Sequence, residues 1–332
     1  MKNGLIRSIN LKKIVFILPY FGKFNNYFDL FLKSCEYNES INWLIFTDDY
    51  KEYNYPANVK VHYMQFEELK TLIKSKFDFD AIIDSPYKLC DYKPAYGYIF
   101  EEYIQDYDYW GHCDCDLIFG DIRKFITEDK LDIFDKLFCL GHCTLYKNSE
   151  EINRVFMKQL GDEKPFKKVY SSSDSFTFDE EYLSCNVNEI FLEHGYKVLE
   201  DDYSANISGR HPDFRVVRFD QLSRNYIMEE KNKNFFIFDK GKIKKYQKKF
   251  HDLRITEYMY IHLQSRKMDV CTNNYNKYKI VTNRFTDLEF ENINDDNFDQ
   301  VRTIYPNNFR TRFIKSEIKF WTKRIMKKIV NK

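Results

Sequence analysis

Two aspartates that directly follow an apolar segment are the residues best suited to chemistry. Asp114 and Asp116 come after Tyr109–Cys113 (YWGHC), which reads as a buried strand. Side chains two positions apart on an extended chain share one face, so both carboxylates can point at the same cation. Oxygen ligands suit Mg²⁺ or Mn²⁺, and such a cation would hold a diphosphate. The pattern predicts a metal site, with an Asp-rich surface turn as the alternative.

Histidines and cysteines near the same segment raise the question of zinc. Their spacing matches no Cys-x-x-Cys pairing, and the strand periodicity turns Cys113 and Cys115 away from the Asp face. The residues concerned are His112, Cys113, Cys115, Cys139, His142 and Cys143. The spacing therefore disfavours a zinc site.

Strands and helices alternate through the first half of the chain. The predicted strands are 13–19, 43–47, 59–64 and 109–113, and the predicted helices are 25–37, 66–76 and 93–104. This alternation predicts an α/β fold with a mainly parallel, doubly wound sheet that binds ligands at the carboxyl ends of its strands.

The second half is less regular. We predict a strand at 136–140, helices at 152–160 and 181–193 with a polar loop at 161–177, a hairpin at 235–246 and a strand at 258–263.

Charge is distributed unevenly along the 332 residues. Of the 52 Lys and Arg and 51 Asp and Glu, nine basic residues and one acid lie in 309–332, which leaves an acidic body. The apolar residues of 309–332 recur at helical spacing, so we predict a basic amphipathic helix that binds an anionic membrane surface, or else packs on its own domain or a partner. An acidic body disfavours nucleic acid as a partner.

No apolar run is long enough to span a bilayer, and the first 24 residues contain no cleavage site. We therefore expect a soluble chain in the cytoplasm, peripheral at the inner face of the cell membrane. Its predicted domain is 1–308, with a donor-binding half at about 1–125 and an acceptor half at about 126–308, followed by the helix 309–332.

The Asp-x-Asp motif and its surroundings resemble GT-A glycosyltransferases, and in particular an uncharacterised bacterial family associated with capsular and other surface polysaccharides. The matching segments are IVFILPYFGKF (14–24), WLIFTDD (43–49), YKLCDYKPAYGYIF (87–100), YWGHCDCDLIFGDI (109–122), LGHCTLY (140–146), FDE (178–180) and YIHLQSRKM (260–268). The resemblance implies a GT-A fold and metal-dependent transfer of a hexosyl group. The donor would be a nucleotide sugar, expected to be a UDP-sugar, and the acceptor a polysaccharide or lipid-linked oligosaccharide.

The same resemblance assigns residues to the donor site. It implies that the nucleotide contacts strand ends and the start of a helix, at Pro19, Tyr20, Phe21, Thr47, Asp48, Asp49, Asp91 and Lys93. The alternative for each is a loop or helix-capping role.

In such enzymes a late histidine often completes the metal site, and basic residues after it hold the diphosphate. His262 matches that ligand, and Arg266 and Lys267 match the basic residues. A strand histidine buried in the core is the alternative.

The acceptor side is implied in the same way. Inverting members place a catalytic base at a helix start, where Asp179 is the first candidate and Glu180 its rival. Helix capping is the alternative for both. His142 is predicted to line the acceptor pocket.

Two other functions remain open at this point. A nucleotidyltransferase also uses a doubly wound sheet and an Asp pair, although 17–24 (ILPYFGKF) is not its usual Gly-rich phosphate loop. A non-catalytic protein of the membrane surface would leave the Asp pair inert.

Overall fold

The computed structural model describes residues 11–180, 185–209, 211, 213–249, 252–264 and 266–302. Strands from the first 199 residues build a seven-stranded sheet. The sheet order is β3-β2-β1-β4-β7-β6-β8. Its strands are β1 Ile14–Tyr20, β2 Ile41–Thr47, β3 Val59–Tyr63, β4 Tyr109–Cys113, β6 Lys136–Leu137, β7 Cys143–Lys147 and β8 Val198–Leu199.

The first four strands are parallel, as the alternation of strands and helices predicted. The sheet as a whole is mixed, because β7 returns beside β4 in the opposite direction and places Cys143 opposite Cys113. The chain is therefore α/β, with mixed sheets in place of the expected mainly parallel one.

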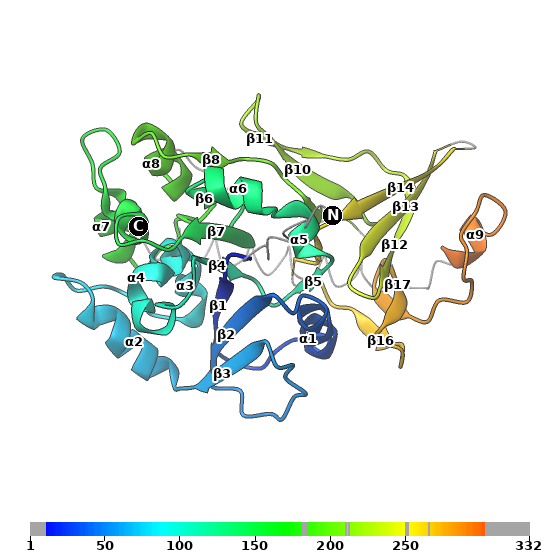
Figure 1. Cartoon of the computed structure of the whole chain (residues 1–332), viewed down its shortest axis with the longest axis horizontal. Helices are drawn as coiled ribbons and strands as arrows, with labels where there is room; N and C mark the ends of the chain where they lie inside the picture. The colour runs from blue at the N-terminus through cyan, green and yellow to red at the C-terminus, as the bar shows by residue number, and fades with distance from the viewer. Residues whose placement is uncertain are drawn as a thin grey trace, which may run out of the picture.

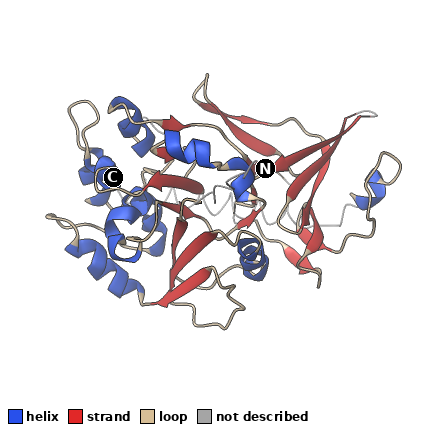
Figure 2. Cartoon of the chain, viewed as in Figure 1, coloured by secondary structure: helices blue, strands red, loops and turns tan. Residues whose placement is uncertain are grey.

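Strand periodicity gives this sheet a core on each face. Ile14 and Phe16 pack in one core with helix α1 (Phe28–Glu36), whereas Val15 and Ile17 pack in the other with α2 (Phe66–Ser75). Figure 1 shows α2, α3, α4, α7 and α8 gathered on one side of the molecule, and Figure 2 shows that the other side is mainly strand.

Most of the remaining helices are short. They are α3 Leu89–Tyr92, α4 Tyr96–Ile99, α5 Ile122–Phe125, α6 Glu128–Ile133, α7 Pro165–Tyr170, α8 Val187–Glu193 and α9 Phe298–Val301, with 3₁₀ turns at Pro86–Lys88, Lys93–Ala95, Glu101–Tyr103 and Ile152–Met157. The helix predicted at 93–104 is instead a series of short turns, which begins earlier in the chain, at Pro86. The loop predicted at 161–177 contains α7.

A second sheet has the order β11-β10-β9-β15-β5. Its strands are β5 Leu117–Phe119, β9 Ser204–Ile207, β10 Val216–Asp220, β11 Asn225–Met228 and β15 Tyr260–His262. The β15 strand lies between β5, which is antiparallel to it, and β9, which is parallel. This sheet therefore joins the segment after Asp116 to the C-terminal half.

The third sheet has the order β14-β13-β12-β17-β18-β16. Its strands are β12 Lys233–Asp239, β13 Ile243–Lys249, β14 Asp252–Tyr258, β16 Asp269–Cys271, β17 Lys277–Val281 and β18 Arg284–Thr286. The β12–β13 hairpin confirms the prediction at 235–246, and Gly241 supplies the positive φ (77°) of its turn.

No helix in the described ranges is long and apolar enough to cross a bilayer. The basic segment 309–332 and the domain boundary predicted before it lie outside the described residues.

Candidate functional site

Three predicted metal ligands meet where β4 passes into β5. Asp114 and Asp116 occupy the link between these strands, and His262 is the last residue of β15. Because β15 pairs with β5, His262 lies opposite Leu117, next to Asp116, and the N–H of Leu263 donates to the carbonyl of Asp116 at 3.1 Å. The antiparallel register thus brings the late histidine to the Asp pair.

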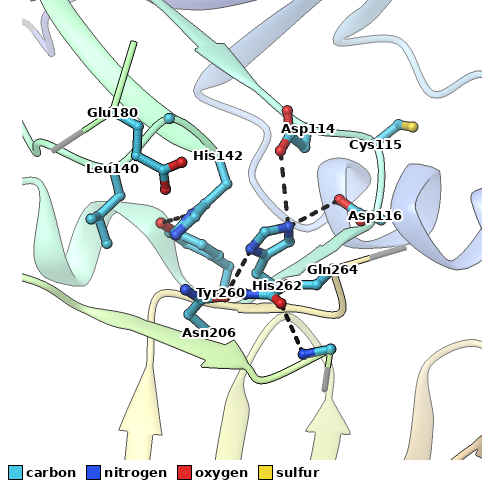
Figure 3. Close-up of polar contacts among 12 residues, drawn as sticks. Asp114, Cys115, Asp116, Leu140, His142, Glu180, Asn206, Tyr260, His262 and Gln264 are labelled. Carbon is cyan, nitrogen blue, oxygen red and sulfur yellow. Dashed lines mark hydrogen bonds and ion pairs between the residues drawn. The ribbon is translucent and has the colours of Figure 1, made fainter. Parts of the chain in front are cut away.

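The potential ligand atoms of these three side chains lie within 4.8 Å of one another. Nε2 of His262 is 3.4 Å from an oxygen of Asp116 and 3.9 Å from an oxygen of Asp114 (Figure 3). Two carboxylates and an imidazole suit a divalent cation such as Mn²⁺ or Mg²⁺. The residues present therefore fit the metal that the sequence predicted.

The charge on this cluster appears in the pKa of His262. Burial lowers that pKa, but the carboxylates of Asp116 and Asp114 outweigh burial, so it is raised above its ordinary value. Without a cation the two carboxylates therefore favour a proton on the imidazole.

The orientation of His262 is set by a chain of hydrogen bonds. The backbone N–H of Gly209 donates to Oε1 of Gln264 at 2.8 Å, so the amide nitrogen of Gln264 faces Asn206 and donates to its Oδ1, also at 2.8 Å. That oxygen can only accept, so Nδ1 of His262 donates to it at 3.0 Å. A metal on the side of the Asp pair would therefore bind Nε2, in place of the proton that the two carboxylates favour there.

Sequence reasoning missed Asn206 and Gln264. Asn206 lies on β9, opposite His262 in the parallel register, and its segment carries no recognisable signal. Gln264 lies two residues after His262 and has a φ of 48°, a left-handed conformation that is uncommon for a residue other than glycine. Its proximity to His262 was the one sequence signal available.

Lys93 lies against the metal cluster, which consists of the three potential ligands Asp114, Asp116 and His262. Its Nζ is 2.8 Å from Oδ1 of Asp114 and 3.2 Å from Oδ2 of Asp179, and it donates to the carbonyl of Gly141 at 2.7 Å. Burial lowers the pKa of Lys93, but Asp114 and Asp179 outweigh burial and raise it well above its ordinary value. The expected nucleotide contact of Lys93 is thus replaced by contacts within the protein.

Asp179 and Glu180 are adjacent but differ in environment. Asp179 is only 5% exposed, and burial raises its pKa to about 7, although Lys93 opposes that shift. Glu180 is less buried, and one of its carboxylate oxygens accepts the hydroxyl of Tyr226 at 3.3 Å. Figure 3 shows Glu180 on the side of the site occupied by His142.

Neither acid caps the helix that was expected to begin there. Helix α8 begins at Val187, and its cap is Asn186, whose side chain accepts the N–H groups of Asn188 and Glu189. The expectation that Asp179 opens this helix is therefore wrong, since Asp179 lies eight residues before it in a turn.

His142 packs behind the predicted metal ligand. Its ring centroid is 4.4 Å from that of His262, and its Nδ1 is 2.9 Å from the hydroxyl of Tyr260. Burial lowers the pKa of His142 well below its ordinary value. At 3% exposure His142 supports the site from inside, so a role in lining an acceptor pocket stays a prediction.

The ends of β1 and β2 are adjacent, with Tyr20 opposite Thr47. Tyr20 is half-buried, and burial, followed by Cys115, Asp116 and Asp49, raises its pKa to about 12. In the loop after β1, the side-chain amide of Asn25 donates to the carbonyl of Cys115, between the two aspartates, at 3.1 Å. Pro19 is partly exposed beside it. This edge of the sheet therefore meets the metal cluster.

Several predicted donor residues instead maintain the loop after β1. Asp48 accepts the N–H of Gly22 at 2.7 Å, and Asp49 accepts that of Phe24 at 3.2 Å. Thr47 is buried and accepts the N–H of Asp49. These hydrogen bonds shape the loop without excluding a nucleotide from its outer face.

Burial disfavours two of the expected nucleotide contacts, at Phe21 and Asp91. Phe21 packs on the ring of Phe66 in the core, with ring centroids 5.2 Å apart. Asp91 is fully buried, pairs with Lys88 at 2.8 Å and accepts backbone N–H groups. It therefore has no surface left for a nucleotide.

Arg266 was expected to hold a diphosphate. Its guanidinium is buried and donates to the carbonyls of Ser208 and His211 at 2.9 and 2.6 Å, and burial lowers its pKa to about 10. It binds the loop that also contains Gly209, whereas Lys267 is exposed. Of the two basic residues, Arg266 therefore has a structural role, and Lys267 is at the surface.

Fold and site together define an α/β protein whose paired carboxylates and oriented histidine could hold a divalent cation. The chain belongs to DUF6625, a family of unknown function, which it matches over residues 16–289. That span contains the metal cluster, Lys93 and Asp179. No curated protein matches the chain.

Proposed function

We propose that this protein is a metal-dependent glycosyltransferase of the GT-A type that uses a nucleotide sugar, expected to be a UDP-sugar. The observation that carries the proposal is the Asp114, Asp116 and His262 cluster, in which Nε2 of His262 faces the two carboxylates. A bound Mn²⁺ or Mg²⁺ would neutralise the negative charge that develops on a diphosphate leaving group.

The donor nucleoside would lie over the ends of β1 and β2. Tyr20 supports this placement, because it is partly exposed at the end of β1, and Asn25 in the loop that follows donates to the carbonyl of Cys115, between Asp114 and Asp116. Pro19, Asp48 and Asp49 would shape the surface against the base and ribose. A nucleotide held there would extend its phosphates toward the Asp pair.

The acceptor hydroxyl needs a base if the reaction inverts the anomeric centre. Glu180 is the better placed of the two candidates, since it is less buried than Asp179 and contacts Tyr226 but no cation in the described contacts. Its charge adds to those of Asp116 and Asp114 in raising the pKa of His262. Glu180 would accept the proton from the incoming sugar hydroxyl.

The acceptor in this proposal is a polysaccharide or lipid-linked oligosaccharide of the bacterial surface. The segment 309–332 would bind the inner face of the membrane and keep the enzyme close to such an acceptor. This would place a cytoplasmic, peripheral enzyme in capsular or related polysaccharide synthesis.

A panel of nucleotide sugars with Mn²⁺ tests the proposal, with nucleotide release by slow hydrolysis as the first readout. Wild type is compared with Asp116→Asn and His262→Ala, and with Asp132→Asn as a control on an exposed carboxylate. We expect release of nucleotide from one donor, lost in the two site variants and kept in the control.

Other outcomes favour the other functions. Release of pyrophosphate from a nucleoside triphosphate and a sugar phosphate would identify a nucleotidyltransferase. Absence of donor-dependent Mn²⁺ binding would favour a non-catalytic protein of the membrane surface. Full activity of Asp116→Asn in EDTA would refute the metal site.

A further inference from the structure

Lys93 presents an electrostatic problem for any metal at this site. Its ammonium group lies 2.8 Å from Asp114, on the carboxylate oxygen opposite the one nearest His262. A cation bound by Asp114 would therefore lie close to a second, fixed positive charge. Such repulsion in a poorly solvated site weakens metal binding unless a further negative charge balances it.

Asp179 supplies that negative charge. Its Oδ2 is 3.2 Å from Nζ of Lys93, and its side chain is slightly more buried than that of the lysine. A Cβ placed on Gly141 would lie 2.4 Å from Oδ2, so the backbone closes over this oxygen. This leaves little room for a sugar hydroxyl to reach it.

The chain fixes Asp179 in this position through two buried charged residues. Asp91 accepts the N–H groups of Phe176 and Phe178, both at 3.1 Å, and these residues belong to the segment that leads to Asp179. Lys88 pairs with Asp91 and donates to the carbonyl of Asp174 at 2.6 Å. Segments 88–93 and 174–179 are thus held side by side, with Lys93 and Asp179 at one end.

We propose that Lys93 and Asp179 are a positioning pair for the metal centre, in which Lys93 holds Asp114 and Asp179 neutralises Lys93. One oxygen of Asp114 contacts the lysine, and the other faces His262. With the pair neutral, the charges of Asp114 and Asp116 balance a divalent cation. The inference rests on the metal site of the proposed function and not on sugar transfer.

The test is a titration of the full-length protein with Mn²⁺ alone at pH 8. Electron paramagnetic resonance measures the concentration of free Mn²⁺ at each step. Asp179→Asn leaves Lys93 without its balancing charge, so we expect Mn²⁺ affinity to fall by about 10- to 100-fold. Removing the lysine as well, in Lys93→Met/Asp179→Asn, removes the unbalanced charge. We expect this double variant to regain most of the lost affinity, short of the part that the contact of Lys93 with Asp114 contributes. Circular dichroism and thermal unfolding check that both variants fold.

Glu180→Gln is the matched control, because it removes one carboxylate at the neighbouring position, where the described contacts are with Tyr226 and not with Lys93. We expect a smaller loss of affinity than in Asp179→Asn. An equal loss in the two variants would overturn the inference, and so would a double variant that binds as weakly as Asp179→Asn.

Transfer activity gives a second readout. At saturating Mn²⁺, a positioning role predicts that the double variant recovers the turnover that Asp179→Asn loses. If turnover stays lost while affinity recovers, Asp179 takes part in the reaction and the inference is wrong. If wild type binds Mn²⁺ but transfers no sugar, the proposed function fails and the affinities still decide the inference.

Discussion

Asn206 provides the sharpest test of the metal site, because no sequence motif implicated it. Its Oδ1 accepts from Nδ1 of His262 at 3.0 Å, and its side chain is buried. Asn206→Leu keeps a side chain of similar size but removes the acceptor. A metal on Nε2 requires the proton on Nδ1, so the metal-bound variant would contain a buried donor without a partner.

The size of the effect follows from that missing acceptor. A buried, unsatisfied donor costs about 1–3 kcal/mol, which corresponds to a loss of about 5- to 150-fold in metal affinity. At a pH above the raised pKa of His262, the metal-free variant escapes most of this cost, because the neutral ring can move its proton to Nε2 and donate to Asp116, whose oxygen is 3.4 Å away. The loss should therefore appear in metal binding more than in stability.

The assay is Mn²⁺ titration by calorimetry, with urea unfolding of the metal-free proteins alongside. Asn206→Asp is the matched variant, since its carboxylate still accepts from Nδ1, and we expect it to bind Mn²⁺ at least as tightly as wild type. Wild-type affinity in Asn206→Leu would refute the assigned tautomer. An equal loss in both variants would indicate that the amide, and not the acceptor, matters.

Three further predictions concern protons, the acceptor and the membrane. The pKa of His262 is raised from 6.5, so a proton competes with the metal, and Mn²⁺ affinity should rise with pH in a window above 6.5. Calorimetry at several pH values checks this, and the same pH dependence in His262→Ala would contradict it. Glu180→Gln should lower transfer by about 10²–10⁴-fold with donor affinity retained, and unchanged turnover in a steady-state assay would remove Glu180 from the reaction. Deleting 309–332 removes nine basic residues, each of which contributes about 1 kcal/mol near an anionic surface. Co-sedimentation with anionic vesicles should then be lost, and unchanged binding would exclude this segment as the membrane contact.

The sequence indicated the metal cluster because local patterns carry it. Asp114 and Asp116 follow a five-residue strand whose periodicity places them on one face, and both β1 and β2 were predicted within two residues of their bounds. The pairing of β15 with β5 is not local, since His262 and Leu117 are far apart in the chain. His262 was identified through family resemblance and not through its spacing.

The roles of buried polar residues could not be predicted from the sequence, and the reason is physical. The resemblance assigned Lys93, Arg266 and Asp91 to a ligand. Each in fact satisfies a partner inside the protein, although Lys, Arg and Asp are ordinarily exposed. Such roles depend on carbonyls and amides brought close by tertiary packing. Asn206 was missed for the same reason, because the segment around it has no pattern of its own.

The position of Arg266 bears on how a diphosphate could be stabilised. Its guanidinium donates to the carbonyls of Ser208 and His211, and the ammonium of Lys93 is shared by Asp114 and Asp179. Neither of these basic side chains keeps its charge available for a leaving group. Charge balance on the diphosphate would then depend on the cation held by the Asp pair and His262, together with the exposed Lys267. On this reasoning the proposed transfer depends strictly on the metal, and the hydrogen bonds that orient His262 matter to it as much as the ligands themselves.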